Sequence, residues 1–252
     1  MYSFIIHYHS RRLDNLLQTL QFLKINHSEI ISNSELTLIC QDQNTVAVDG
    51  FAEVKQISMN LNVMNLPLLT NEGVKSAKYD KIIVLESDRI LPKGYFQEVL
   101  DEIQPGIMIT TKYMKKLLAP ATNDDIIQEN YDTYCDDRSI TCEFGIKNMW
   151  SGNTACMKSD FLKVGGIDPY YLGYGWADCD MTLTMEQAGI QSIYKKNYTE
   201  LHLWHEQQTY GTGDQKQLFI NNCLYVCRKW KRPVPEFMIK EMAAHRNDKF
   251  FI

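Results

Sequence analysis

Apolar and polar positions in the first half of the chain follow two alternating patterns. Residues 2–8 form a β-rich run, and the leucines after Ser10, a candidate N-cap, recur at the spacing of one helix face. Residues 36–40 and 81–85 are continuous apolar runs, which are typical of parallel strands covered by helices on both faces. Helical patterns occur at residues 66–77 and 95–103. This half therefore predicts a Rossmann-like, doubly wound arrangement whose ligand site lies beyond the carboxyl ends of the strands.

The second half has shorter and more mixed patterns. Residues 119–142 are rich in Asn, Asp, Thr and Tyr with little periodicity, and we interpret them as a long surface excursion that serves as a lid. Beyond it we expect a strand, a short helix, a turn rich in Gly and aromatic residues, a helix closed by Gly189 and a strand, at residues 149–157, 159–164, 165–176, 178–188 and 190–194. The chain thus predicts one α/β domain over residues 1–252, with a mostly parallel sheet, a nucleotide-type half at 1–115 and a half at 116–252 that holds a second substrate.

Composition and charge narrow the class of protein. The 252 residues carry 26 Lys and Arg against 31 Asp and Glu, a formal net charge of -5, which makes a general nucleic-acid-binding surface a poor hypothesis. Seven Cys occur without a CxxC pair, as expected for reduced core residues. Since no apolar segment approaches the ~18 residues that cross a bilayer, we expect a cytoplasmic protein. Residues 228–252 are locally basic, which predicts either a solvated tail, the favoured interpretation, or a peripheral contact with an anionic membrane face.

Two carboxylates directly follow the apolar run at 81–85. Glu86 and Asp88 are two positions apart, so both side chains leave the end of a buried strand on the same side, toward the expected crevice. On spacing alone, a polar loop after a strand explains the pair equally well. As a functional site, the pair would bind a divalent cation together with the oxygens of a diphosphate.

Two imidazoles occur three positions apart in the segment His202-Leu203-Trp204-His205. If both face the acidic pair, a site of carboxylate oxygen and imidazole nitrogen suits Mn²⁺ better than Mg²⁺, which prefers oxygen ligands and its own waters. The alternative is one exposed His and one His packed near Trp204.

A Gly- and aromatic-rich turn at 165–176 precedes two aspartates, Asp178 and Asp180, at a predicted helix start. Such turns suit a sugar site, because glycine lets the backbone approach closely and aromatic rings stack on the apolar face of a pyranose. One of the two aspartates is explained by N-capping and the helix dipole. The other is free to act as a base, and we expect this to be Asp178.

These segments resemble a known family when they are taken in order. They are Ile5 to Arg11, Asn71-Glu72-Gly73, Glu86-Ser87-Asp88, Gly165 to Asp168, Gly173 to Asp180 and His202 to His205. Their order and approximate spacing are similar to those of GT-A glycosyltransferases, in particular the family 2 and β-1,4-galactosyltransferase-like branch that includes chondroitin polymerase-type domains. Each motif is weak alone, and the ordered set spans residues 2 to 230.

The resemblance implies a GT-A fold and a metal-dependent inverting transfer of a sugar from a nucleotide diphosphate, a UDP-sugar by preference, to a glycan or lipid-linked acceptor. It assigns nucleotide binding to Tyr8, His9, Arg11, Gln41, Asp42, Asn71, Glu86 and Ser87. It assigns Mn²⁺ or Mg²⁺ binding to Asp88, His202 and His205, and the general base to Asp178. The walls for the acceptor and donor sugar would be Trp150, Gly152, Asn153, Tyr174 and Trp176, with Asp180 beside them.

The sequence departs from the family pattern at three places. Glu86 replaces the first Asp of the DxD motif, Ala177 stands where a Glu usually precedes the base, and residues 65–70 lack the expected basic residue. The last two departures bear on acceptor identity and on donor-phosphate neutralisation. A catalytically degenerate relative that only binds nucleotide-sugar or glycan is therefore one alternative. A sugar nucleotidyltransferase is another, although the turn after residues 2–8 lacks the Gly-rich phosphate loop that such an enzyme would normally show.

Overall fold

The computed structural model describes residues 1–42, 45–137, 152–206 and 213–245. Trp150, predicted to contact a sugar, lies outside them. The strands are β1 Ser3–Tyr8, β2 Glu35–Cys40, β3 Glu53–Ser58, β4 Lys81–Glu86, β5 Arg89–Ile90, β6 Ile107–Leu117, β7 Thr133–Asp137, β8 Asn153–Met157 and β9 Gln191–His202. The helices are η1 Ser10–Arg12, a 3-10 turn, α1 Leu13–Ile31, α2 Leu66–Ser76, α3 Tyr95–Glu102, α4 Asn123–Ile127, α5 Lys158–Lys163, α6 Ala177–Gln187, α7 Gly213–Lys229 and α8 Glu236–His245.

The described strands form one mixed sheet in the order β3-β2-β1-β4-β8-β6-β9-β5, with β7 paired to β6. β3, β2, β1 and β4 are parallel, as predicted for the first half. β8 then pairs antiparallel with both β4 and β6, whereas β6 and β9 are parallel. The expectation of a mostly parallel sheet is therefore correct for the first half and wrong for the second. The predicted boundary at residue 115 falls inside β6, and the division of the chain into two halves stays a prediction.

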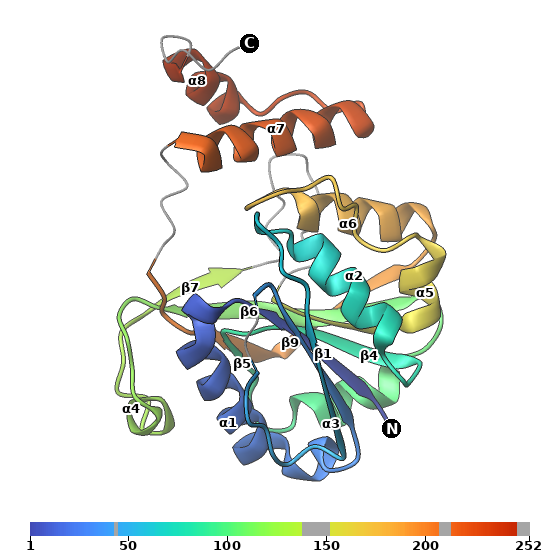
Figure 1. Ribbon diagram of the computed structural model, residues 1–252, viewed down its shortest axis with the longest axis vertical. Helices are drawn as coiled ribbons and strands as arrows, with labels where there is room; N and C mark the ends of the chain where they lie inside the picture. Colours follow the sequence, from blue (N-terminus) through green and yellow to red (C-terminus); the bar gives the residue numbers. More distant parts are fainter. Residues whose placement is uncertain (43–44, 138–151, 207–212, 246–252) are drawn as a thin grey trace.

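Helices cover both faces of the parallel part of the sheet (Figure 1). Alternate residues of β1 point to opposite faces, so Phe4 and Ile6 pack in one core with α1 and α3 while Ile5 packs in the other with α2, α5 and α6. Burial on both faces explains why these strands read as continuous apolar runs. Because β1, β2 and β4 are parallel, their carboxyl ends lie at the same end of the sheet. The turns that follow these strands can therefore form a ligand site.

Several local expectations are corrected by the structure. Ser10 does not cap a helix: it lies in η1, and its N–H and hydroxyl both donate to the Asp42 carboxylate, so that α1 begins at Leu13. Leu17, counted in the apolar face, is 44% exposed. The polar excursion at 119–142 contains α4 and β7, and its last residues lie outside the described part of the chain.

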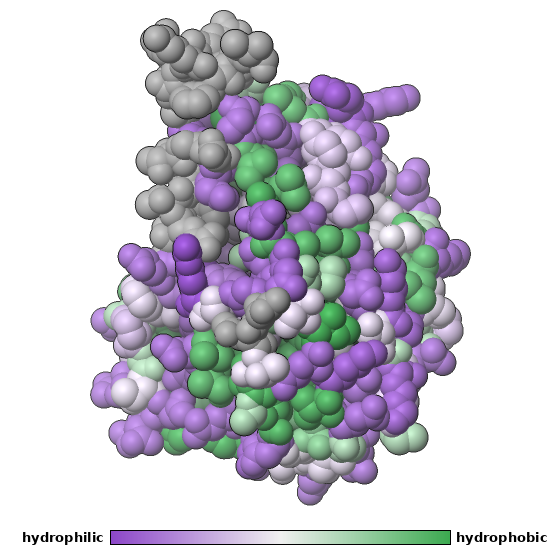
Figure 2. All heavy atoms as spheres, in the orientation of Figure 1, coloured by the Kyte–Doolittle hydropathy of each residue, from purple (hydrophilic) through white to green (hydrophobic). Residues whose placement is uncertain are grey.

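α7 and α8 pack together beyond the sheet, at the top of Figure 1. None of the helices in the described ranges has both the length and the apolar character needed to cross a bilayer. Hydrophilic side chains cover most of the face seen in Figure 2, and hydrophobic ones occur in smaller groups among them. In the locally basic segment at 228–252, the basic residues that the structure describes include Arg228, Lys231 and Arg232, all exposed. Contact of this segment with a membrane stays a prediction.

Candidate functional site

Strand pairing brings the acid pair and the two histidines together. β5 begins just after Asp88 and pairs with the end of β9, so that Arg89 lies opposite His202. The Leu203 N–H donates a hydrogen bond to the Asp88 carbonyl at 2.9 Å, which continues this pairing by one residue. Two segments more than a hundred positions apart therefore meet beyond the carboxyl end of β4.

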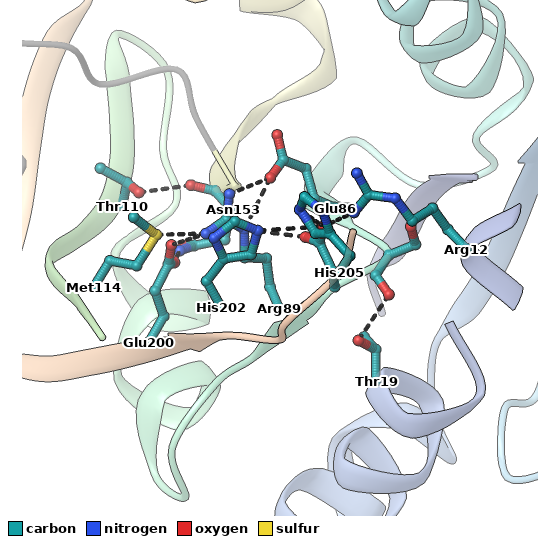
Figure 3. Close-up of polar contacts among 12 residues, drawn as sticks. Arg12, Thr19, Glu86, Arg89, Thr110, Met114, Asn153, Glu200, His202 and His205 are labelled. Atoms are coloured by element: carbon teal, nitrogen blue, oxygen red, sulfur yellow. Dashed lines mark hydrogen bonds and ion pairs between the residues drawn. The ribbon is translucent and has the colours of Figure 1, made fainter. Parts of the chain in front are cut away.

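Asp88, His202 and His205 form a compact group of ligand atoms. Asp88 Oδ2 lies 3.3 Å from His202 Nε2 and 3.5 Å from His205 Nε2. One ligand atom from each residue lies within 4.8 Å of the other two. The structure thus places together the three residues predicted as metal ligands, two of which are labelled in Figure 3.

The hydrogen bonds around this group fit a bound cation. The His205 Nδ1–H donates to the Glu206 carbonyl at 3.2 Å, which leaves the lone pair of Nε2 facing Asp88 Oδ2. Burial, with the nearby charge of Arg12, lowers the pKa of His205 and keeps the ring neutral at pH 7. Two acceptor atoms that face each other in this way are stabilised by a positive ion between them. Within the described part of the chain, the buried Asp88 Oδ1 and His202 Nδ1 also lack hydrogen-bond partners.

Asp88 is ionised in these surroundings. Burial alone would raise the pKa of its carboxyl, but the hydrogen bond from His202 and the charges of Arg89 and Arg12 hold that pKa well below its usual value. The closest of these cationic groups is Arg12, whose Nη1 lies 2.8 Å from Asp88 Oδ2. The site therefore contains a negative charge that is already surrounded by donors and cations.

Arg89 supplies buried positive charge behind the site (Figure 3). Its guanidinium bonds the Glu86 carboxylate through Nε at 2.8 Å and through Nη2, and it lies 3.4 Å from Asp88 and 3.6 Å from Glu200. Burial would raise the pKa of Glu86, but the charge of Arg89 lowers it below the usual value. Glu86 is thus engaged by Arg89, and Asp88 is the member of the acid pair that faces the histidines.

The ligand-atom group opens into a cavity of about 310 Å³. Asp178, in the first turn of α6, lines this cavity together with Asp88, His202 and His205. Asp178 also lines an adjoining cavity of about 80 Å³. The residues predicted to bind nucleotide or sugar that line one or both cavities are Tyr8, His9, Glu86, Ser87, Gly152, Asn153 and Tyr174. The predicted base therefore shares a cavity with the predicted metal ligands.

The charged or titratable residues that line the cavity of about 310 Å³ and were not predicted from the sequence are His7, Arg12, Arg89 and Lys116. Arg12 and Lys116 bring positive charge to this cavity, and such groups bind phosphate oxygens well. The signal for Arg12 was present in the sequence, because it adjoins Arg11 in the polar turn after β1. Arg11 itself lines a different cavity of about 660 Å³, which Arg12 and His205 also line.

Gln41 and Asp42, which are predicted to bind the nucleotide, lie at the carboxyl end of β2. The Asp42 carboxylate accepts from the Ser10 N–H at 3.1 Å and from the Ser10 hydroxyl, and the Gln41 amide donates to the Leu61 carbonyl at 3.2 Å. Neither residue lines the three cavities described above. Their contact with a nucleotide stays a prediction.

Three predicted contact residues make structural hydrogen bonds in the fold. Asn71, assigned to the nucleotide, bonds both the N–H and the carbonyl of Ile167, at 2.8 and 2.6 Å, and so fixes the Gly-rich turn. The side chain of Asn153 accepts from the Tyr95 hydroxyl at 2.6 Å and donates to Thr111 and Glu200 in the buried network. These contacts hold the Asn153 side chain in the network of the sheet, and its contact with a sugar stays a prediction.

Asp180 is the third of these residues. It is 1% exposed, accepts from the Trp230 indole at 2.6 Å and forms an ion pair with Lys229 at 2.8 Å. Asp180 therefore anchors the end of α7 to α6 and does not face the cavity that Asp178 lines. Neither aspartate is the N-cap of α6, which is Trp176 with a φ of 73°.

The Gly- and aromatic-rich turn packs on α7. A Cβ on Gly175, whose φ is +91°, would lie 2.6 Å from the Phe219 ring, and one on Gly173 would lie 3.0 Å from Gln215. These glycines therefore allow α7 to approach, which is a different reason from the predicted close approach to a sugar. Trp176 packs beside Phe219 with ring centroids 5.8 Å apart, whereas Tyr174 is 51% exposed and lines both site cavities.

Comparison with known families gives one match within the chain. Residues 133–206, which include Asp178, His202 and His205, match a family described as the N-terminal domain of galactosyltransferase. No curated protein matches the sequence.

Solved structures resemble the chain over most of its length. GalNAc-T7 with UDP, GalNAc and Mn²⁺ has a TM-score of 0.64 and 14% identity, over 90% of this chain and 47% of that chain. S. aureus TarS 1-349 in complex with UDP-GlcNAc has a TM-score of 0.58 and 12% identity, over 90% of this chain and 66% of that chain. The catalytic domain of Drosophila beta1,4galactosyltransferase 7 in complex with xylobiose has a TM-score of 0.51 and 16% identity, over 86% and 77%.

These comparisons confirm the predicted resemblance and fold. The chain has the α/β fold of GT-A glycosyltransferases. The structures that share this fold include a β-1,4-galactosyltransferase, the Drosophila enzyme. The family match at residues 133–206 supports a glycosyltransferase. The chain spans about half of the length of the matched chains of GalNAc-T7 and of another TarS structure, at 47% and 44%.

Proposed function

We propose that this chain is a metal-dependent, inverting glycosyltransferase that moves a sugar from a UDP-linked donor to a hydroxyl of a glycan or lipid-linked acceptor. The observation that carries the proposal is the shared cavity of about 310 Å³, in which Asp178 and the group of Asp88, His202 and His205 line the same space. A transferase of this kind needs a base for the acceptor and a cation for the leaving diphosphate within the length of one donor molecule.

Asp178 is the group that takes the acceptor proton. It lies in the first turn of α6, where the helix dipole favours the ionised carboxylate that a base needs. As the acceptor hydroxyl attacks the anomeric carbon, its proton passes to Asp178 and the bond to the diphosphate breaks on the opposite face of the sugar. A positioned base of this kind contributes about 10²- to 10⁴-fold to the rate.

Asp88, His202 and His205 would hold the cation. One carboxylate oxygen and two imidazole nitrogens favour Mn²⁺ over Mg²⁺. When bound, the ion supplies Lewis-acid stabilisation of the departing diphosphate. Arg12 and Lys116 line the same cavity and add positive charge for the phosphate oxygens, which compensates for the lack of a basic residue at 65–70.

The structural relatives support a UDP-sugar as the donor class, because structures of GalNAc-T7 and TarS contain UDP or UDP-GlcNAc. The acceptor class is supported by the Drosophila enzyme, which was solved with xylobiose. We therefore expect UDP-hexoses or UDP-N-acetylhexosamines to stabilise the protein in a thermal melt when Mn²⁺ is present. A donor at 100 times its dissociation constant adds about 2.7 kcal/mol to the free energy of unfolding. No stabilisation by any UDP-sugar, with or without Mn²⁺, would contradict the proposed donor class.

We predict that Asp178→Asn keeps donor binding but lowers turnover by at least about 100-fold, because the amide cannot accept the acceptor proton. Release of UDP from the best-stabilising donor measures turnover, and the thermal shift measures binding. Asp101→Asn is the matched control, because it makes the same change at an exposed position of α3 that lines none of the described cavities. Near-normal turnover by Asp178→Asn would remove Asp178 from the role of base. If the wild type binds donor and acceptor without turnover, the chain is a degenerate binding relative.

A further inference from the structure

The guanidinium of Arg12 occupies the same carboxylate oxygen that the two histidines face. Its Nη1 lies 2.8 Å from Asp88 Oδ2, and the Nε2 atoms of His202 and His205 lie 3.3 and 3.5 Å from that oxygen. Arg12 comes from η1, the turn that follows β1, and enters the site from the side opposite β9 (Figure 3). Asp88 Oδ2 is therefore shared by three cationic or metal-ligating groups.

A divalent ion bound by Asp88 and the two histidines would lie a few ångströms from this guanidinium. Two positive charges at such a separation repel each other strongly where water is scarce, and the side chains of Arg12 and Asp88 are only 15% and 10% exposed. Arginine cannot relieve this repulsion by losing a proton, because a guanidinium stays charged in proteins. Binding of the ion consequently requires that Arg12 leave Asp88.

Arg12 and Arg89 differ in their freedom to move. Arg89 is 6% exposed and is held by Glu86, with Glu200 close behind, so its position does not depend on Asp88. The ion pair of Arg12 within the described residues is with Asp88 alone. Arg12 also lines both the cavity of about 310 Å³ and the neighbouring one of about 660 Å³, which leave room for its side chain to turn.

We propose that Arg12 is an internal counter-cation that competes with the divalent ion for Asp88 and is drawn off by the diphosphate of the nucleotide. This proposal rests on the proposed function, because it requires the metal site and the anionic donor. Without nucleotide, Arg12 weakens metal binding. With nucleotide, the phosphate oxygens provide Arg12 with another anionic partner and Asp88 becomes available to the ion. Metal and nucleotide therefore strengthen each other's binding by the same factor.

The test is a titration of Mn²⁺, measured as loss of the free-ion EPR signal, in the presence and absence of UDP. Removing the competing charge should make Arg12→Gln bind Mn²⁺ at least about fivefold more tightly than the wild type when UDP is absent. UDP should tighten Mn²⁺ binding in the wild type, and this enhancement should shrink in Arg12→Gln. An Arg that merely supported the fold, or merely bound phosphate, would not raise the affinity for the ion when mutated.

Arg228→Gln is the matched control, because it makes the same substitution and removes the same charge at an exposed residue of α7 that lines none of the cavities described above. We expect its Mn²⁺ affinity without UDP to stay within about twofold of wild type, since exposed charges are well screened. Arg12→Met repeats the test with a different side chain if Arg12→Gln folds poorly in a thermal melt.

The outcomes separate this proposal from the proposed function. Measurable Mn²⁺ binding by the wild type, with equal or weaker binding by Arg12→Gln and Arg12→Met, would overturn the exchange and leave the metal site intact. Absence of Mn²⁺ binding by the wild type, with and without UDP, would overturn the metal site and the exchange together. A similar gain in affinity in Arg228→Gln would show a general charge effect and would also overturn the role assigned to Arg12.

Discussion

A single oxygen, Oδ2 of Asp88, is the atom on which the site depends. Arg12, His202 and His205 all place a nitrogen within 3.5 Å of it. Arg89 stands behind them as a fixed cation shared with Glu86, so the two arginines have different tasks. Arg89, which is buried, keeps the carboxylates of Glu86 and Asp88 ionised. Arg12, which lies in the cavity wall, responds to ligands. This division explains how Asp88 stays ionised although it is buried beside a second carboxylate, Glu86.

At this scale we predict a large loss of stability in Arg89→Met. The substitution leaves the carboxylates of Glu86, Asp88 and Glu200 without their shared cation, and breaking a buried ion pair in this way costs about 3–5 kcal/mol. Urea unfolding at pH 7 measures the loss. Because protonation neutralises unpaired carboxylates, the loss should be smaller at pH 5 than at pH 7.

Lys78→Met provides the control for Arg89→Met. Lys78 pairs with Glu53 at 2.6 Å on the surface, with both side chains about half exposed, and such exposed pairs contribute little to stability. We expect this variant to unfold at the same urea concentration as the wild type. Equal destabilisation by the two substitutions would contradict the structural importance of the buried cluster.

At the scale of elements, α1 is bent at one buried histidine. His27 has non-helical dihedral angles, φ −139° and ψ 27°, inside the helix. Its Nε2–H donates to the Leu91 carbonyl at 3.2 Å, its ring meets Phe96 at 4.6 Å, and its Nδ1 is buried without a hydrogen-bond partner in the described residues. A proton added at Nδ1 would thus place a positive charge with no partner between α1 and α3.

This geometry predicts a pH-dependent contribution to stability. Burial lowers the pKa of His27 from 6.5 to about 4, so as the pH falls from 6.5 to 4 the unfolded chain takes up a proton that the folded chain does not. Stability is therefore lost over this window, by about 3 kcal/mol for a shift of this size. His27→Gln keeps a donor for Leu91 and cannot titrate, so it should lose less stability in acid.

Urea unfolding of the wild type and His27→Gln at several pH values between 4 and 7 measures the effect. The pKa values of His7, His9 and His205 are also lowered by burial, so only the difference between the two curves reports on His27. Parallel curves between pH 6.5 and 4 would contradict the neutral, buried state of His27.

For the whole molecule, patterns in the sequence predicted those elements whose own residues show how they are buried. The strands near 36–40 and 81–85 were found because strands buried on both faces are uniformly apolar. β3 was missed because its residues Glu53–Ser58 lie largely exposed at the sheet edge and are mostly polar. The grouping of Asp88 with the two histidines followed from the family resemblance, and strand pairing at Arg89 and His202 provides its physical cause.

What the sequence could not provide was the partner of each polar side chain. From the sequence alone, Arg89 is an ordinary polar residue after a strand. Its role depends on the pairing of β5 with β9, which brings Glu200 beside it. Asn71 and Asp180 have residue types and positions that fit a binding site, yet the fold uses them to fix a turn and a helix. A polar residue next to a site is therefore distinguished from a residue of the site only by knowing what else it contacts.

The most direct test of the central claim is a crystal structure of the protein with Mn²⁺ and UDP, in which anomalous scattering locates the metal. The account predicts one anomalous peak between Asp88 Oδ2, His202 Nε2 and His205 Nε2, with the diphosphate beside it and Asp178 facing the same cavity. A peak bound elsewhere, or UDP seated in the cavity with no ion at these three residues, would contradict it.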